Sequence, residues 1–303
     1  MPTEVSIIIV SYNTKALTKQ AVAAAYASSQ THGLEVIVVD NGSTDGSQEA
    51  LKKAFPMLVL IQQKTNGGFS QANNRGAQEA KGKYLFFLNS DTEIEQGATD
   101  VLVKELERSS KVGIVSGMLL NEDGSVQPQG GALPNLLNIK AWMMFVDDFP
   151  LVNRLFLPYQ QSRSSYFTAR HQMGWIGGTA VMMRKTVFSQ IGAWDEHIFL
   201  YGEDIELCLR LHKAGFLSVY TPEAKIVHLK HQSAGAERAA KGEVEGLLYI
   251  WKKHFPAWQL PFLRLILLTG AWLRILIFGI LLGDDEKKRT YTEIARSLAV
   301  AGR

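Results

Sequence analysis

Short apolar runs alternate with helical stretches through residues 1–120, and this alternation limits the possible fold more than any other feature of the sequence. The runs are rich in Val, Ile and Phe and almost uninterrupted, which indicates strands buried on both faces. Repeated strand–helix units predict an α/β fold with a mostly parallel sheet and right-handed crossovers. We expect strands at 5–12, 36–41, 58–62, 84–89 and 112–117, and helices at 14–29, 47–55, 70–80 and 97–109.

Residues 121–174 break this pattern with several turn signals and one expected helix near 136–146, so we interpret them as an insertion or a lid. A second structured block follows. We expect strands at 175–183, 217–220 and 226–229, and helices at 185–191 and 203–214.

Composition excludes several classes of protein. With 46% hydrophobic and 20% charged residues in a chain of 303, disordered and low-complexity proteins are ruled out. The single cysteine, Cys208, excludes an internal disulfide and any zinc or iron–sulfur site built from several cysteines. The opening apolar run is too short for a secretion signal, so we expect a cytoplasmic protein.

The basic residues are concentrated near the C-terminus. Residues 1–224 carry 19 Lys and Arg against 22 Asp and Glu, whereas residues 225–303 carry 13 against 7. Because these cations are not interleaved with aromatic residues, we expect no nucleic-acid partner. Their distribution suits an anionic lipid surface better.

Polar residues follow three of the expected strands, at the edge where parallel sheets bind ligands. They are Ser11-Tyr12-Asn13, Asp40-Asn41-Gly42-Ser43 and Asn89-Ser90-Asp91. The Asp40 carboxylate could accept a hydrogen bond from N3–H of uracil or thymine, although the whole run could equally be turn and helix-cap chemistry. Asp91 suits a divalent cation such as Mg²⁺ or Mn²⁺, with His228 as a second ligand if the fold brings it near; the alternative is a helix-cap cluster.

Two further motifs lie at expected helix starts. Gly67-Gly68 allows close approach of a diphosphate to a helix N-terminus, although glycine pairs are more often plain turns. Glu203-Asp204 begins another helix, whose dipole favours ionised carboxylates, as a general base requires. The alternative for this pair is that it only complements the helix dipole.

The order of these motifs resembles that of the family 2 inverting glycosyltransferases of the GT-A fold, and most of all the rhamnosyltransferase-like members. The resemblance covers about residues 5–235. It is carried by residues 5–13, 38–47, 66–69, 73–76 and 88–91, and by Trp175-Ile176-Gly177-Gly178, Gly192-Ala193-Trp194-Asp195-Glu196 and Tyr201-Gly202-Glu203-Asp204.

This resemblance implies a role for each matched position. Asp204 would be the catalytic base and Glu203 would orient it or the acceptor, while Asp91 and His228 would hold the metal. Nucleotide-binding positions would be Ser11, Tyr12, Asn13, Asp40, Gly68, Asn73 and Ser90, and acceptor or sugar-binding positions Trp175, Gly177, Gly178 and Tyr201. Two positions depart from the family pattern: Asn73 stands where many members carry Arg, and Asn89 where the Asp-x-Asp motif has its first acid.

The implied activity is sugar transfer, with inversion, from a nucleotide diphosphate donor to a saccharide or lipid-linked saccharide in bacterial surface polysaccharide synthesis. The expected donor is dTDP-rhamnose, with UDP sugars second. A sugar-nucleotide pyrophosphorylase would need a glycine-rich loop with Arg and Lys after the first strand, and residues 11–15 do not provide it. The presence of both Asp91 and Asp204 argues against a non-catalytic sugar-nucleotide-binding module.

The chain is expected to comprise a GT-A catalytic domain at 1–235, with a nucleotide-binding half at 1–120 and an acceptor-side half at 121–235, and a helical extension at 236–303. Within the extension, residues 262–283 are long enough to span a bilayer, but Arg264 and Arg274 interrupt them on one side of the helix. We therefore expect an in-plane helix on the cytoplasmic face of the inner membrane. The alternative is packing on the catalytic domain or in a homo-oligomer interface.

Overall fold

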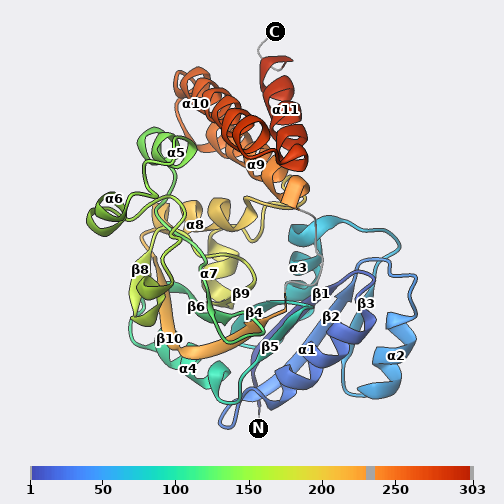
Figure 1. Ribbon diagram of the computed structural model, residues 1–303. Coiled ribbons are helices and arrows are strands. Elements are labelled where there is room, and N and C mark those ends of the chain that lie inside the picture. Colours follow the sequence, from blue (N-terminus) through green and yellow to red (C-terminus); the bar gives the residue numbers. More distant parts are fainter. Residues whose placement is uncertain (1, 230–235, 301–303) are drawn as a thin grey trace. The chain divides into compact units, whose positions relative to one another are not determined.

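The computed structural model describes residues 2–229 and 236–300 and divides into two compact units (Figure 1). Unit 1 comprises Met1–Gly130 and Arg163–His231, and unit 2 comprises Gly131–Ser162 and Gln232–Arg303. Each unit is therefore assembled from two separate stretches of sequence.

The described part of unit 1 contains one ten-stranded sheet in the order β3-β2-β1-β4-β9-β6-β10-β5, with β7 beside β6 and β8 beside β10. The six main strands point in the same direction, and β9 runs in the opposite direction between β4 and β6. The main strands are β1 (Thr3–Ser11), β2 (Gly33–Asp40), β3 (Val59–Gln62), β4 (Tyr84–Asn89), β6 (Val112–Leu120) and β10 (Leu217–His228). The antiparallel ones are β5 (Thr92–Ile94), β7 (Val126–Gln127), β8 (His171–Met173) and β9 (Ala180–Arg184).

Helices cover the sheet because its strands are apolar on both faces. Side chains of Ile7, Val38 and Phe86 are completely buried, and Val22 of α1 packs into the same core. The helices of unit 1 are α1 (Lys15–Ala27), α2 (Ser47–Ala54), α3 (Gly68–Glu79), α4 (Ala98–Glu107), η1 (Ser164–Thr168), α7 (Lys185–Gln190) and α8 (Glu203–Lys213). The predicted fold class, a mostly parallel sheet flanked by helices, is confirmed, with every expected element of residues 1–120 present.

Two strand predictions are wrong in detail. The strand expected at 175–183 begins only at Ala180, because the chain turns at Gly178 and sends that N–H to a side chain of α8 instead of a neighbouring strand. The two strands expected at 217–220 and 226–229 are one strand, β10, with an irregularity in register between Tyr220 and Lys225.

Unit 2 is helical in its described part. It comprises α5 (Leu136–Met143), α6 (Pro150–Leu155), α9 (Ala236–His254), α10 (Gln259–Arg274), the π-helical continuation η2 (Ile275–Leu281) and α11 (Asp285–Val300). Helix α10 contacts α5, α9 and α11, and its Leu263 and Leu267 are fully buried there. The helix expected near 136–146 is confirmed as α5.

Arg274 lies inside unit 2. Its guanidinium donates hydrogen bonds to the carbonyl oxygens of Met143 (2.7 Å) and Trp142 (3.2 Å) in the last turn of α5, where carbonyl oxygens lack the i+4 N–H partners of a helix interior. The guanidinium carbon also lies 4.4 Å from the ring centroid of Phe145 and 5.6 Å from that of Tyr291. The arginine that interrupts the long apolar stretch thus connects α10 to the end of α5.

Candidate active site

The carboxyl ends of β1 and β2 place Asp40 beside Ser11, because these residues are paired in register. Asp40 is completely buried, and its Oδ1 accepts hydrogen bonds from the Ser43 N–H (2.9 Å) and from Nε2 of Gln48 (2.6 Å). Its Oδ2 has no hydrogen-bond partner among the described residues. A buried carboxylate oxygen is costly unless a donor reaches it, so Asp40 has one acceptor available to a ligand.

Polar side chains hold the loop after β1 in place. The Ser11 hydroxyl lies 2.9 Å from Oγ1 of Thr18, in the interior. The backbone N–H of Asn13 donates to Oγ of Ser43, and Oδ1 of Asn13 accepts from the Thr44 N–H, each at 2.8 Å. Ser11 and Asn13 therefore shape this loop, whereas the Tyr12 ring is half exposed and available to a ligand.

Gly68 lies where two backbone segments approach each other closely. Its φ is +86°, and a Cβ at this position would lie 2.7 Å from the carbonyl oxygen of Phe199. The next N–H, of Phe69, donates to that same carbonyl at 3.1 Å. On the same helix Asn73 is buried, with Nδ2 on the Phe69 carbonyl and Oδ1 without a partner in the described chain. The glycine thus joins the start of α3 to the loop before α8.

Asp91 and His228 meet because β10 pairs with β5, with His228 opposite Thr92. Oδ1 of Asp91 lies 3.4 Å from Nε2 of His228, whose Nδ1 lies 3.0 Å from Oε1 of Gln127. Oδ2 of Asp91 is buried and unpartnered within the described residues, and Ser90 next to it accepts a hydrogen bond from the Thr14 hydroxyl (3.1 Å).

This pair could hold one divalent cation. Among residues 2–229 and 236–300 no group of three His, Cys, Asp or Glu side chains is placed to bind a metal. A cation here would therefore have one carboxylate and one imidazole from the protein. That donor set suits an ion that takes its other ligands from substrate oxygens.

Asp204 lies at the start of α8, facing a glycine turn. Its Oδ2 accepts a hydrogen bond from the Gly178 N–H (3.1 Å) and its Oδ1 accepts one from the Ile205 N–H (2.8 Å). Gly177 also faces this carboxylate, since a Cβ there would lie 3.8 Å from Oδ2. Removal from water raises the pKa of Asp204 above that of an ordinary aspartate.

The pKa of the neighbouring acid, Glu203, is raised as well. Glu203 is buried, and its Oε2 has no partner in the described chain. Burial, and then the charge of Asp204, raise the pKa of Glu203 to about 8. Burial and the neighbouring carboxylate therefore favour the protonated form of Glu203 at neutral pH.

This raised pKa predicts how stability depends on pH. A folded-state pKa of Glu203 of about 8, against 4.5 ordinarily, means that the folded protein binds more protons between these values than the unfolded chain. The stabilisation is complete below the ordinary pKa and is lost as pH rises through the folded one. Thermal melting from pH 5 to 9 should show that Tm falls as pH rises. The fall should be smaller in Glu203→Gln, and it should be unchanged in Glu286→Gln, a variant at an exposed site. An equal decline in all three proteins would contradict the raised pKa.

The rim of the Asp204 site is shaped by backbone conformation. Tyr201 has a φ of 71° in the left-handed region, followed by Gly202 at 96°, so the chain turns sharply into α8. Trp175 is nearly buried at the other end of the glycine turn. The turn also reaches β4, because the N–H of Asn89 donates to the Thr179 carbonyl at 2.9 Å. One short turn thus connects the end of β4, which precedes Asp91, to the Asp204 carboxylate.

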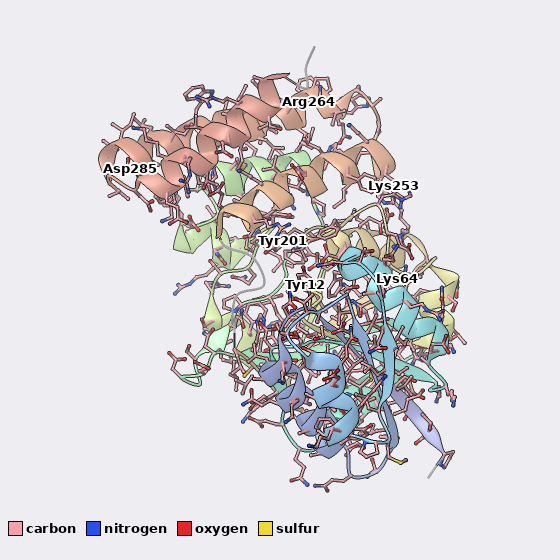
Figure 2. The ribbon with its side chains drawn as sticks, turned by 90° about the vertical axis from the view of Figure 1, so that its right-hand side faces the viewer. Tyr12, Lys64, Tyr201, Lys253, Arg264 and Asp285 are labelled. Carbon is pink, nitrogen blue, oxygen red and sulfur yellow. The ribbon has the colours of Figure 1, made fainter. Side chains whose placement is uncertain are left out.

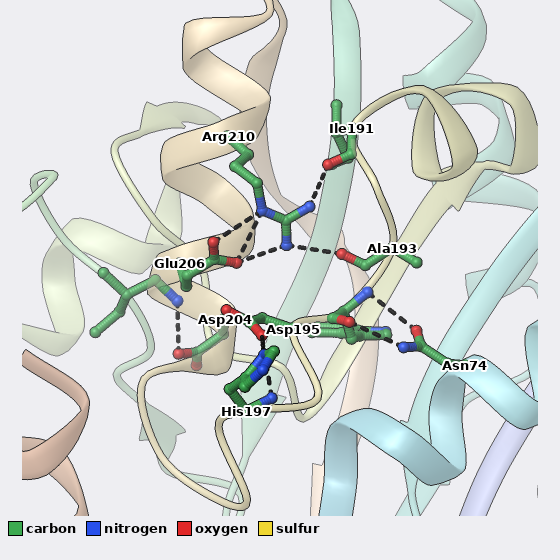
Figure 3. Close-up of polar contacts among 10 residues, drawn as sticks. Asn74, Ile191, Ala193, Asp195, His197, Asp204, Glu206 and Arg210 are labelled. Atoms are coloured by element: carbon green, nitrogen blue, oxygen red, sulfur yellow. Dashed lines mark hydrogen bonds and ion pairs between the residues drawn. The ribbon is translucent and has the colours of Figure 1, made fainter. Parts of the chain in front are cut away.

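Sequence reasoning missed the residues that hold the loop before α8 (Figure 3). Arg210 of α8 forms an ion pair with Glu206 (2.5 Å) and donates to the carbonyl oxygens of Ile191 and Ala193. Asn74 of α3 donates to the Trp194 carbonyl (2.9 Å) and accepts from the Trp194 N–H (3.0 Å). A basic residue one turn after Glu206 was a visible signal for the ion pair, but its carbonyl partners depend on the tertiary fold.

Comparison with known proteins agrees with this geometry. The family model described as glycosyl transferase family 2 matches residues 6–192. An N-acetylglucosaminyl-diphospho-decaprenol L-rhamnosyltransferase of Mycobacterium tuberculosis is 28% identical over 242 residues, which cover 75% of this chain and 78% of the relative. The O-antigen biosynthesis protein RfbC of Myxococcus xanthus is 29% identical over 247 residues, 80% of this chain but 18% of that much longer protein.

Solved structures of GT-A glycosyltransferases share the fold. GalNAc-T7, crystallised with UDP, GalNAc and Mn²⁺, has a TM-score of 0.59 at 17% identity and covers 86% of this chain, which spans about half of that one (53%). The mannosyltransferase PcManGT of Pyrobaculum calidifontis, in complex with GDP-Man and Mn²⁺, has a TM-score of 0.58 at 18% identity; the match covers 100% of this chain and 77% of that one. Since the family model matches more than half of the sequence, the chain belongs to glycosyl transferase family 2 and is an inverting glycosyltransferase with the GT-A fold.

Proposed function

We propose that this enzyme transfers L-rhamnose from a dTDP donor to an N-acetylglucosamine carried on a lipid diphosphate, during bacterial surface polysaccharide synthesis. The names of the Mycobacterium tuberculosis and Myxococcus xanthus relatives support the sugar and the pathway class. The observation that carries the chemistry is the Asp204 carboxylate, held by the Gly178 N–H and next to a protonated Glu203.

In the proposed reaction, the acceptor hydroxyl attacks the anomeric carbon from the face opposite the diphosphate. A new C–O bond forms as the bond to the diphosphate breaks, which inverts the configuration, and Asp204 takes the hydroxyl proton. Its raised pKa suits this task, because the best general base has a pKa near the working pH. Glu203, mainly protonated, can donate a hydrogen bond to the acceptor or to the base without adding a second negative charge.

We propose that Asp91 and His228 hold a divalent cation, Mg²⁺ or Mn²⁺. The unpartnered Oδ2 of Asp91 and the nearby imidazole support this, and Mn²⁺ was present in both similar crystal structures. When bound, the cation would neutralise the leaving diphosphate. The nucleotide would lie along the strand ends, against Tyr12, with Ser11, Asn13, Gly68, Asn73 and Ser90 shaping its pocket.

We propose that the acceptor enters past Trp175 and Tyr201, over the turn of Gly177 and Gly178. Transfer itself is tested with dTDP-rhamnose and a synthetic N-acetylglucosaminyl-diphospho-lipid, with dTDP release and the glycosylated product as readouts. UDP-N-acetylglucosamine and GDP-mannose serve as competing donors. Faster transfer from either would contradict the assigned sugar, while leaving the family intact.

Selectivity for the base is expected to depend on Asp40. Its free Oδ2 can accept from N3–H of thymine or uracil, whereas cytosine presents an acceptor at N3. By calorimetry, dTDP and UDP should therefore bind more tightly than CDP. Asp40→Asn should weaken dTDP binding by roughly 10- to 100-fold, the usual effect of losing a hydrogen bond to a charged group.

The matched control is Asp45→Asn in the same loop, where the carboxylate is occupied by the Lys15 N–H (3.0 Å) and by Ser47. This change should leave the order of nucleotide affinities as it is. A preference for CDP in the unmodified enzyme would overturn the role of Asp40, and a preference for GDP would overturn the choice of sugar.

A further inference from the structure

Unit 2 carries most of the exposed apolar surface of the protein. Of the 17 large hydrophobic side chains exposed in residues 2–229 and 236–300, 14 belong to unit 2, although it contains only about a third of the chain. Soluble proteins rarely expose so much apolar surface without a partner. Most of these exposed side chains fall into two groups, one along α10 and η2 and the other around α6.

The first group forms a stripe along α10 and η2. Its members follow one another after three, four or seven residues, which is one or two helical turns, and are 47% to 63% exposed: Trp258, Phe262, Leu265, Trp272, Leu276 and Ile280. The opposite face of the same helix is buried in unit 2, through Leu263, Leu267, Gly270, Ala271, Arg274 and Ile275. The helix is therefore apolar on both sides and packed on only one.

The second group is in the segment between α5 and the end of α6, which the sequence had suggested was part of a lid. Val146, Phe149, Leu151, Leu155 and Phe156 are 42% to 70% exposed. This segment starts next to η2, since the ring of Phe145 packs edge-on against that of Phe278, with centroids 6.0 Å apart. The start of this segment and the η2 end of the stripe are thus neighbours within unit 2.

We propose that the α10 stripe and residues 146–156 together dock unit 2 in the plane of an anionic lipid membrane. Residues 131–162 and 232–303 hold 13 Lys and Arg against 9 Asp and Glu, so the unit carrying the apolar surface also has the positive charge that complements such a membrane. Trp258 and Trp272 lie on the stripe, and tryptophan favours the level of the lipid headgroups.

The helix from Gln259 to Leu281 is 23 residues long and apolar enough to cross a bilayer, but its packing favours the in-plane orientation. A spanning helix would have to leave α5, α9 and α11. It would also take Arg274 away from the carbonyl oxygens of Met143 and Trp142 and place it in hydrocarbon. Figure 2 shows Arg264, near the start of α10, and Asp285, just after η2, toward opposite ends of the helical unit.

The test uses the full-length protein and vesicles of phosphatidylcholine alone or mixed with phosphatidylglycerol. One variant replaces Phe149, Leu151, Leu155 and Phe156 by Ser, and a second replaces Leu265, Trp272, Leu276 and Ile280 by Gln. Met57→Ser is the control, because Met57 is the most exposed large apolar side chain of unit 1. All these residues are exposed, so the variants should keep their fold, unlike a truncation at residue 260, which would remove the partners of α5 and α9.

Flotation should show tight binding of the parent and of Met57→Ser to the anionic vesicles. Each four-residue variant should lose roughly tenfold or more of that binding. If the 146–156 variant bound the vesicles as tightly as the parent, that segment would not be part of the membrane-binding surface. Self-association that the substitutions abolish, without any vesicle binding, would assign the surface to a second copy and overturn the proposal.

Depth measurement distinguishes an in-plane helix from a spanning one. Trp258 and Trp272 are 14 residues apart, about 21 Å along a helix axis. With lipids brominated at defined carbons, the quenching lost in Trp258→Phe and the quenching lost in Trp272→Phe should report the same shallow depth for these two residues, the other four of the six tryptophans being common to both variants; different depths would indicate spanning. Binding of dTDP should be unchanged throughout, because every proposed nucleotide contact lies in unit 1, so a failure here leaves the proposed transfer reaction standing.

Discussion

Asp204→Asn is expected to lower kcat by roughly 10²- to 10⁴-fold, the usual range for loss of a general base. The amide has nearly the size of the carboxylate, and its oxygen can still accept from the Gly178 N–H, so the turn at the site should keep its shape. Calorimetry should accordingly show nearly unchanged donor binding. The measurement is single-turnover transfer followed by dTDP release.

Asp285→Asn is the matched control, because this acid also lies in the first turn of a helix, α11, but in unit 2. It should turn over at the parental rate. If Asp204→Asn did so as well, Asp204 would only complement the dipole of α8. Glu203→Gln completes the series: it mimics the protonated neighbour, so it should retain most activity at neutral pH and lose less of it than the parent above pH 8.

Removal of divalent cations is expected to abolish transfer, and Mg²⁺ or Mn²⁺ should restore it. Asp91→Asn should lower kcat/KM by about 10³-fold at a fixed metal concentration, because a bound cation contributes several kcal/mol to stabilising a leaving phosphate. The substitution should also shift the metal concentration that gives half-maximal activity to higher values. His228→Gln should show the same shift with a smaller loss, since Asp91 remains.

Glu95→Gln is the control for this experiment, because Glu95 is exposed and lies four residues after Asp91, beyond the end of β5. Its metal dependence should match that of the parent. Full activity of the parent in excess chelator would contradict metal ligation by Asp91 and His228, and Asp91 would then be a structural partner of His228.

The nucleotide-binding half was predictable because its signals are local. The strand 84–89 is uniformly apolar and ends in Asn89-Ser90-Asp91, so both its burial and its polar end follow from neighbouring residues. The contact between Asp91 and His228 could be predicted from the sequence only on the condition that the fold brings them together. It requires β10 to pair with β5, which is more than a hundred residues away in the chain.

Other features depend on contacts that no local pattern encodes. Gly177 and Gly178 were assigned to a strand on their apolar neighbours, but the Gly178 N–H bonds to Asp204, which is distant in sequence. The sequence around Arg274 did not indicate its partners, because they are carbonyl oxygens at the end of α5, a helix more than a hundred residues earlier in the chain. The grouping of residues 131–162 with the C-terminal helices likewise has no signal within either stretch.

Unit 2 is built from two separate stretches of sequence, so the ribosome completes unit 1 before it completes unit 2. All of unit 1 has been synthesised once His231 has left the exit tunnel, whereas α5, made much earlier, meets its partner α10 only when the C-terminal stretch follows. Arg274 then donates a hydrogen bond to the end of α5, which lies more than a hundred residues earlier in the chain. The catalytic unit can therefore fold before the helices of unit 2 pack together, which leaves the α10 stripe to be completed at the end of translation.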